Sequence, residues 1–396
     1  MANLINLLAQ TPWNTGFWGT LIGWFHGGIG NYVWTIIIFT IVLKLVMTPL
    51  DYFQRRVTKK NTEMQKIMQP ELDKIKDKYK NQPEKMQQKL NEKQMELYKK
   101  HNYNITGSCF IMLINLVLTM VVFLTLFSSL NTIASIQMAN QFDALRTEYE
   151  FVVDTNGDKV VADEAKQLAI KNAQVNLDNL YNSLIEAGFS SEDALKQRND
   201  AEIKIGEDAY RIALVGSVDQ EIIDNALQTK YNKDVKESWL WVKNVWKSDT
   251  ATSVIPTYSE YLSLSKTTEE ISEADYNSIM DPIRKIETGW NGYYILIVLA
   301  GGVTLLSQLL MTGALRKKSK SGDKAPKQGG LLMKILLPGL MIFFTISSNA
   351  VFAAYVVTNS LISMAITPLF TLLFNSIDKY KEKKEKDKIV VDYRRK

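Results

Sequence analysis

Hydrophobic and charged positions are sorted into long blocks along this chain. Four stretches are nearly free of Asp, Glu, Lys and Arg: 33–50, 108–130, 292–313 and 331–373. Lys44 and Lys334 are the only residues of these four types that they contain. A membrane-spanning helix needs about 20 mostly apolar residues, so the first three stretches each suit one span. The fourth suits two spans joined by a turn at 347–349. The pattern predicts an all-α membrane protein built as a five-transmembrane-helix bundle.

The composition argues against an enzyme and against a disulfide framework. The 396 residues include one Cys and two His, His26 and His101. A single Cys forms no internal disulfide, and so few Cys and His residues exclude a multi-Cys metal site. The sequence motifs of zinc proteases, P-loop nucleotide-binding proteins and serine hydrolases are absent. We therefore expect no catalytic activity, no metal and no cofactor.

The distribution of charge predicts the orientation in the membrane. Segments 51–107, 314–330 and 374–396 have net charges of +6, +5 and +4, whereas 131–290 has 28 acidic and 16 basic residues. Basic segments next to spans tend to stay in the cytoplasm. The sequence therefore predicts a multi-pass protein with its N-terminus outside and its C-terminus in the cytoplasm.

These patterns divide the chain into spans, a cytoplasmic helical hairpin and an inserted extracytoplasmic domain. The expected segments are 1–32 as an interfacial segment on the outer surface, 33–50 as span one, 51–107 as the cytoplasmic hairpin, 108–130 as span two, 131–290 as the extracytoplasmic insertion, 291–313 as span three, 314–330 as a cytoplasmic loop, 331–373 as spans four and five, and 374–396 as a basic cytoplasmic tail.

The segment 51–107 has the periodicity of two amphipathic helices. Apolar residues recur every three or four positions on both sides of a turn at 81–84, with Pro83 placed to open the second helix. The apolar positions are Met64, Ile67, Met68, Leu72 and Ile75 before the turn, and Met86, Leu90, Met95 and Leu97 after it.

Lys44 is the most unusual residue of the apolar stretches. Counted from Asn31, it lies about 20 Å along a helix that crosses a core of about 30 Å. A Lys at that depth costs about 2.5–3.5 kcal/mol on insertion scales. The alternative is that the side chain reaches the cytoplasmic surface, but Cα–Cβ bonds lean toward the helix N-terminus, which opposes this. No Asp or Glu occurs in the four stretches, so we predict an unpaired cation that awaits an acidic group from outside.

Other polar residues of the apolar stretches fall at helical spacing and form four columns. They are Thr40 and Thr48 beside Lys44, Asn115 and Thr119 on the second stretch, Thr304, Ser307 and Gln308 on the third, and Tyr355 and Asn359 on the last. A single Ser or Thr usually bonds its own helix backbone or packs helices together. Four columns around one cation instead favour a hydrated groove in the membrane.

The same residues resemble the YidC/Oxa/Alb family of membrane protein insertases. The likeness runs through T-I-I-I-F-T-I-V-L-K-L-V-M-T-P-L at 35–50, M-Q-P-E at 68–71, L-Y-K-K-H at 97–101 and G-S-C-F-I-M-L-I-N at 107–115. It resumes at L-W-V (240–242) and Y-Y-I-L (293–296), and continues from Lys334 to Asn359. From its first to its last segment the resemblance covers roughly 240 residues, and it leaves most of 131–238 and 248–288 unexplained.

This resemblance implies a five-helix bundle with a groove that is open to the cytoplasm and to lipid. The family's intramembrane basic residue, usually Arg, falls on Lys44, and groove positions fall on Asn115 and Tyr355. Lys keeps the charge but loses the two-pronged carboxylate contact of Arg. Prolines of the family pattern are replaced by Ile111, Val117 and Asn349.

The resemblance also implies a set of partners and a cellular location. Nascent membrane proteins would be the clients, the basic tail and hairpin would contact the ribosome, and phospholipids and the Sec translocon would be further partners. The location would be the bacterial cell membrane.

Two other classes of function remain open from the residues alone. One is a small-solute transporter or channel, for which an inverted repeat with broken helices would be the signature. The other is a membrane-anchored extracytoplasmic binding protein, in which 131–290 would be the functional part.

Overall fold

The computed structural model describes residues 16–101, 103, 105–264, 271–311 and 331–394. The regular elements of these residues are helices, and the β-type pairing within them is one isolated bridge between Trp239 and Val242. The predicted all-α class is therefore confirmed. The chain forms two compact units. Unit 1 comprises Met1–Ser135, Ser238–Ala251 and Asn291–Lys396, and unit 2 comprises Ile136–Glu237 and Thr252–Trp290.

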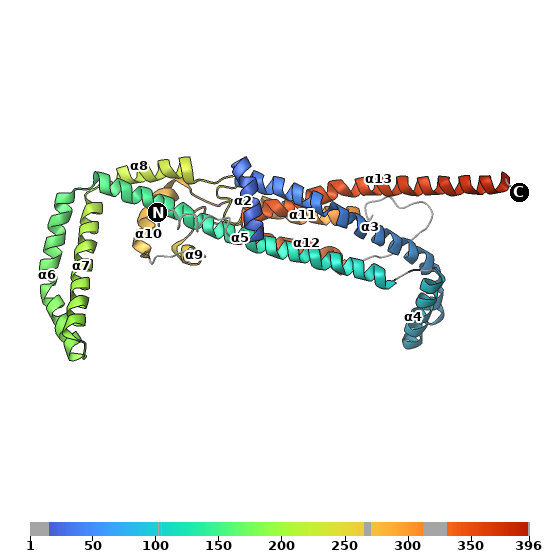
Figure 1. The fold of residues 1–396 in the computed structure, drawn as a ribbon, viewed down its shortest axis with the longest axis horizontal. Coiled ribbons are helices and arrows are strands. Elements are labelled where there is room, and N and C mark those ends of the chain that lie inside the picture. Colours follow the sequence, from blue (N-terminus) through green and yellow to red (C-terminus); the bar gives the residue numbers. More distant parts are fainter. Residues whose placement is uncertain (1–15, 102, 104, 265–270, 312–330, 395–396) are drawn as a thin grey trace. The chain divides into compact units, whose positions relative to one another are not determined.

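Unit 1 is a bundle of long helices. Its elements are α2 (Phe17–Ile29), α3 (Tyr32–Lys78), α4 (Pro83–Lys100), the first part of α5 (Ile105–Asn156), α11 (Ile295–Met311), α12 (Leu331–Ile346) and α13 (Ala350–Arg394). Helix α13 packs against α3 and α11, and α11 packs against α12 (Figure 1). Helix α2 packs along α3, and its end is marked by Gly30, which has a φ of 75°.

Three helices of the described residues are long and apolar enough to cross a membrane: Tyr32–Lys78, Leu113–Asn156 and Ala350–Ile377. They overlap the predicted spans one and two and the second half of the stretch 331–373. Helices α11 and α12 have 17 and 16 residues, so the spans predicted there stay a prediction. The predicted turn at 347–349 is confirmed, because α12 ends at Ile346 and α13 begins at Ala350.

The surface of α5 in unit 1 is apolar. Its outward side chains include Leu113, Leu116, Val117 and Met120, which are 54%, 60%, 54% and 54% exposed. An apolar surface of this kind is unfavourable in water and suits the hydrocarbon of a bilayer. The protein is therefore a membrane protein.

The predicted hairpin is formed by α3 and α4. Pro83 is the first residue of α4, as predicted, and Met64, Met68 and Leu97 form the buried core between the two helices. Ile67 and Met95 are 51% and 53% exposed, so these two predicted apolar positions lie outside the core. Helix α3 continues without a break from the apolar stretch into the hairpin.

A polar cap lies at the N-terminal ends of α11 and α13. We use this name for four buried side chains: Asn244, Asp249, Asn291 and Asn349. The Asp249 carboxylate, on a residue 1% exposed, accepts a hydrogen bond of 2.9 Å from the backbone N–H of Leu296 in α11. The Asn349 side-chain oxygen accepts one of 2.9 Å from Phe352 N–H in α13. The first N–H groups of a helix have no partner within it, so these side chains satisfy donors that would otherwise be buried unpaired.

The segment 238–251 is held in place by Asn291. The Asn291 side-chain oxygen accepts from Asn244 N–H at 2.7 Å, and its amide group donates to the Asn244 carbonyl at 2.8 Å. The Asn291 backbone N–H donates to the carbonyl of Ala251 at 2.9 Å. The chain thus leaves unit 1 after residue 251 and returns at 291 beside the same point.

Backbone groups extend the polar cap to α13 and α5. The carbonyl of Lys247 accepts a hydrogen bond of 2.9 Å from Ala350 N–H, the first residue of α13. The Asn349 amide group donates to the side-chain oxygen of Asn131 in α5 at 2.9 Å. Residues 238–251, which we had placed in an insertion of 131–290, therefore pack within unit 1.

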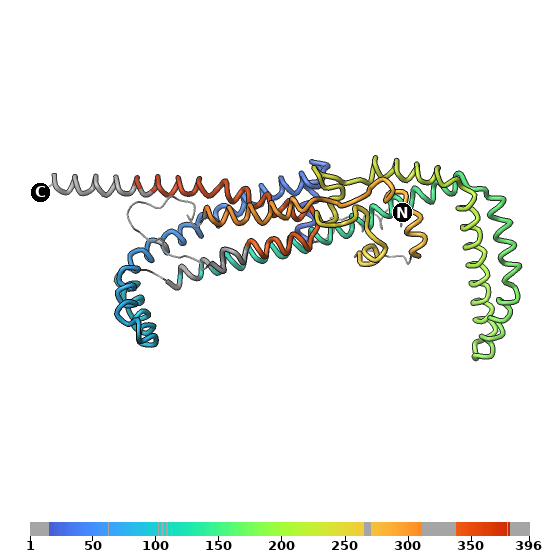
Figure 2. The backbone as a smooth tube through the Cα atoms, turned by 180° about the vertical axis from the view of Figure 1, so that it is seen from behind, coloured from blue at the N-terminus to red at the C-terminus, as the bar shows by residue number. Residues whose placement is uncertain are grey.

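Unit 2 contains the end of α5 and a set of shorter helices. They are α6 (Lys159–Glu186), α7 (Ser191–Gly216), α8 (Gln220–Lys230), the π-helical turn η1 (Tyr231–Val235), α9 (Tyr258–Leu262) and α10 (Glu273–Ile286). Helices α6 and α7 form an antiparallel hairpin (Figure 2). Phe142 of α5 stacks on Tyr276 of α10 with ring centroids 5.2 Å apart, at the centre of the unit's apolar core.

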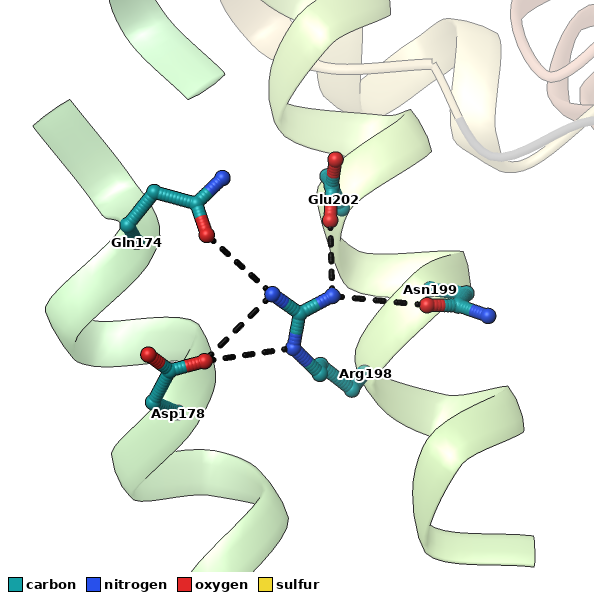
Figure 3. A network of polar contacts seen from close by, with 5 residues as sticks. All are labelled: Gln174, Asp178, Arg198, Asn199 and Glu202. Atoms are coloured by element: carbon teal, nitrogen blue, oxygen red, sulfur yellow. Dashed lines mark hydrogen bonds and ion pairs between the residues drawn. The ribbon is translucent and has the colours of Figure 1, made fainter. Parts of the chain in front are cut away.

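Arg198 joins the two helices of the α6–α7 hairpin (Figure 3). Its guanidinium donates to Glu202 at 2.8 Å on its own helix, and to Gln174 at 3.1 Å and Asp178 at 3.4 Å on α6. The Arg198 side chain is 19% exposed, so water screens these contacts less than those of a surface pair. The network fixes how α6 and α7 are aligned.

The polar cap leads to a prediction about stability. Asp249→Ala removes the acceptor for Leu296 N–H and should lower the free energy of unfolding by about 1–2 kcal/mol, the range for a lost helix cap. Asp249→Asn keeps an oxygen at the same position and should lose less. Thermal unfolding in detergent micelles measures both. Equal stability of Asp249→Ala and the unmodified protein would contradict the role of Asp249 as a cap.

Candidate functional site

Lys44 forms an ion pair with Asp51. The distance from Lys44 Nζ to Asp51 Oδ2 is 2.9 Å, and the two side chains are 17% and 19% exposed. Seven residues are two helical turns, so both side chains lie on one face of α3. The prediction that Lys44 has no partner of its own is wrong. Its partner is the first residue beyond the apolar stretch 33–50, on the same continuous helix.

The direction of the Lys44 side chain also differs from the prediction. The ammonium lies toward the C-terminal end of α3, although the Cα–Cβ bond leans toward the N-terminal end. A Lys side chain has a long flexible stem that can turn against this lean. The attraction to a carboxylate grows as the dielectric constant falls, so in an apolar surrounding it outweighs the lean.

The basic residues that follow Asp51 contact α13. Both terminal nitrogens of Arg55 donate to the hydroxyl of Thr367 at 3.2 Å, and the guanidinium lies 5.1 Å from the ring centre of Phe370. The ammonium of Lys59 lies 5.6 Å from the ring centre of Phe374. The end of the apolar part of α3 is therefore attached to α13 through cation–π contacts and hydrogen bonds.

Two hydroxyl groups of the predicted polar columns, those of Thr40 and Thr48, bond to their own helix. Thr40 donates to the carbonyl of Ile36 at 2.6 Å, and Thr48 donates to that of Lys44 at 2.9 Å. Asn359 contributes its backbone carbonyl, which accepts from Ser363 at 2.8 Å. For these residues the structure supports the alternative stated from sequence, in which a hydroxyl satisfies its own backbone.

One residue of the polar columns bonds to a side chain of another helix. Thr304 of α11 and Ser360 of α13 form a hydrogen bond of 2.9 Å between their hydroxyl groups, and both residues are buried. Ser307 and Tyr355 are buried as well, and Gln308 and Asn359 are half-buried. The third predicted column is thus joined to α13 through Ser360, a residue outside the predicted columns. Sequence analysis missed Ser360, because a bond between residues 56 positions apart leaves no local signal.

Asn115 and Thr119 differ although both belong to the second column. Asn115 is 6% exposed, and its side-chain oxygen has no hydrogen-bond partner among the described residues. Thr119 is exposed. A buried polar group without a partner costs about 1–3 kcal/mol, so the Asn115 side chain lowers the stability of unit 1 unless a donor outside the described residues reaches it.

The candidate site consists of an ammonium–carboxylate pair, a buried hydroxyl pair and the side-chain oxygen of Asn115, which has no hydrogen-bond partner among the described residues. Groups of three or more His, Cys, Asp or Glu side chains that could hold a metal ion do not occur in the described part of the chain.

Comparisons with known proteins place part of this chain in a family. Residues 24–154 match the model of the 60Kd inner membrane protein family. A protein of Fusobacterium nucleatum named membrane protein insertase YidC is 40% identical over 116 residues, which are 29% of this chain and 50% of that protein. The insertase YidC of Leptospira interrogans is 41% identical over 106 residues, 27% of this chain and 16% of that one. This part of the chain is thus similar to YidC-like insertases.

The YidC-like match contains much of the candidate site. It includes α3 with Lys44 and Asp51, the α3–α4 hairpin and the part of α5 that carries Asn115. The insertase YidC of Wolinella succinogenes is 31% identical over 112 residues, 28% of this chain and 19% of that protein. Aligned segments thus span half or less of these three relatives. No solved structure matches this chain.

Asn115 provides a prediction at this site. Asn115→Leu replaces an unpaired buried amide by an apolar side chain of similar size and should raise the free energy of unfolding by about 1–3 kcal/mol. Thr119→Leu, on the same helix but exposed, is the matched control and should change it by less than about 0.5 kcal/mol. Thermal unfolding in detergent compares the two. A lower stability of Asn115→Leu would mean that the Asn115 side chain is held by a partner.

Proposed function

We propose that this protein is a membrane protein insertase. It passes nascent transmembrane segments into the bilayer through a hydrophilic groove lined by α3, α5, α11 and α13. The observation that carries this proposal is the match of residues 24–154 to the 60Kd inner membrane protein family, whose relatives are named membrane protein insertases. The polar side chains of these helices support it: Thr40, Asn115, Thr304, Ser307 and Tyr355 are buried, and Lys44 is half-buried.

The proposed mechanism is physical. Moving a polar segment across hydrocarbon is opposed by the loss of its hydration. Polar side chains at depth in the bundle give such a segment hydrogen-bond and charge partners, so that it crosses a shorter apolar distance. The apolar span that follows leaves the groove sideways and is stabilised by contact with lipid, because its apolar surface is removed from water.

The proposed topology has five spans. Helices α11 and α12 form the third and fourth spans beside the three long apolar helices, with the N-terminus outside and the C-terminus in the cytoplasm. Unit 2 is then the inserted extracytoplasmic domain. This orientation is supported by the net charge of +6 in 51–107 against −12 in 131–290.

Ribosomes and phospholipids are the proposed partners on the cytoplasmic side, with the Sec translocon as a further partner in the membrane. Helix α13 continues to Arg394, and the segment 374–396 carries nine basic and five acidic residues. The hairpin segment 51–107 carries fourteen basic and eight acidic residues. Basic surfaces of this kind attract the phosphates of ribosomal RNA and of anionic lipids.

Reconstitution of the purified protein in lipid vesicles tests the function. A single-span client with an acidic translocated flank should become protected from protease in these vesicles and not in protein-free vesicles. Lys44→Arg keeps the charge and should keep insertion. Lys44→Glu places two carboxylates side by side in α3 and repels the client, so insertion should fall to background. Insertion by the Glu variant at the unmodified level would contradict a role for the charge.

Thiol labelling tests the topology. Asp154 and Lys80 are both exposed, so a cysteine at either position is accessible from its own side of the membrane. In a Cys109→Ser background, Asp154→Cys should react with a membrane-impermeant reagent on intact cells, and Lys80→Cys should react only after lysis. The reverse pattern would overturn the proposed orientation.

A further inference from the structure

The ion pair of Lys44 has a consequence for which clients the protein accepts. Asp51 is the first acidic residue of α3, and it lies where the apolar stretch of that helix ends. Its carboxylate is 2.9 Å from the Lys44 ammonium. The cation that a client carboxylate would seek is therefore already neutralised by a group of the protein itself.

An acidic client must compete with Asp51. The carboxylate of Asp51 and that of the client would bind the same ammonium of Lys44. The Lys44 side chain is 17% exposed, which leaves little room for two partners. The client gains only the difference between its own contact with Lys44 and the contact that it replaces. A client with a neutral flank meets a neutral pair and gains and loses nothing from either charge.

A displaced Asp51 has a second cation within reach. Arg55 is four residues further along α3, which places it on the same face one turn away. The carboxylate of Asp51 is already close enough to the Arg55 guanidinium for an electrostatic attraction between them. The two hydrogen bonds of Arg55 go to the hydroxyl of Thr367, a neutral acceptor, so its positive charge can receive the carboxylate while these bonds remain.

We propose that Asp51 is a specificity-determining residue that holds the Lys44 ammonium in the resting protein and yields it to an acidic flank of a client by turning toward Arg55. This inference rests on the proposed insertase function. It assigns the discrimination between acidic and neutral clients to the competition between two carboxylates. Lys44 alone would favour acidic clients more strongly than the Lys44–Asp51 pair does.

The test uses full-length protein in vesicles and three single-span client proteins as probes. The probes differ at one position of the translocated flank, which is Asp, Asn or Lys. The quantity measured is the ratio of protease-protected acidic probe to protected neutral probe. Asp51→Asn should raise this ratio about fivefold, the size expected for loss of a half-buried competing ion pair. It should also lower the yield of the Lys probe, because that probe then meets an unpaired cation. Asp51→Glu keeps a carboxylate and should restore the ratio of the unmodified protein.

Two further variants separate this effect from a general change in the protein. Asp234→Asn removes the carboxylate of another Lys–Asp pair, Lys230–Asp234 at 2.8 Å in unit 2, and should leave the ratio unchanged. In a Lys44→Gln background, Asp51→Asn should change the ratio much less than in the unmodified protein, because the Lys44 ammonium is no longer there to be released. A ratio that is unchanged by Asp51→Asn, or that responds as strongly in the Lys44→Gln background, overturns the proposal.

Crosslinking decides the case in which Asp51→Asn fails to insert even the neutral probe. A photoreactive residue is placed at position 115, and the probes are stalled on ribosomes. A crosslink between the two reports contact even where insertion is not completed. The ratio of acidic to neutral crosslinks should rise in Asp51→Asn, and no rise overturns the proposal.

If the unmodified protein inserts no probe above the level of protein-free vesicles, the insertase function itself fails. If it inserts probes and only the predicted ratios are absent, the role of Asp51 fails alone.

Discussion

A helix that begins in apolar surroundings must find partners for its first backbone N–H groups, and the arrangement of unit 1 depends on how this is done. The polar cap supplies Asp249 for α11 and Asn349 for α13, and the carbonyl of Lys247 for the first residue of α13. Water can take this role on a soluble helix but not where the helix end is buried. Since Asn349 also bonds Asn131, the same groups determine where α13 lies along α5.

The interior of the bundle combines two kinds of polar residue with opposite effects on stability. Thr40 and Thr48 have their hydroxyl groups satisfied by their own helix, and Thr304 is satisfied by Ser360. These residues place polar atoms inside the bundle at little cost. The side-chain oxygen of Asn115 has no partner among the described residues, which lowers stability. The Lys44–Asp51 pair lies between these cases, because its charges are satisfied by a contact that can be exchanged.

Local sequence signals predicted the elements whose causes are local. Pro83 opens α4 because its fixed φ suits a first helical turn, and the break at 347–349 follows from consecutive polar residues between apolar stretches. The continuation of α3 beyond residue 50 and of α5 beyond residue 130 was not predicted, because a loss of hydrophobicity marks where a helix leaves the apolar region and not where its hydrogen bonding stops. That difference also concealed the partner of Lys44, which is beyond residue 50 on the same helix.

Contacts between distant segments could not be predicted from a single sequence. The pairing of Asn244 with Asn291 joins residues 47 positions apart and carries no periodic signal. It explains why 238–251 packs within unit 1, although its charge and position had suggested one block from 131 to 290. For the candidate site, sequence identified buried Asn115, Thr304 and Tyr355 by helical spacing, but the bond from Thr304 to Ser360 required the fold.

The hydrogen bond between Asn291 N–H and the carbonyl of Ala251 has an evolutionary consequence. The segment 252–290 begins and ends beside this hydrogen bond, so its two ends are held together whatever its length. Closing a longer loop costs only about 0.6 kcal/mol for each doubling of its length. Descendants of this gene can therefore lengthen or shorten the connection between α9 and α10 outside the apolar core of unit 2, while the first turn of α11 is inherited unchanged.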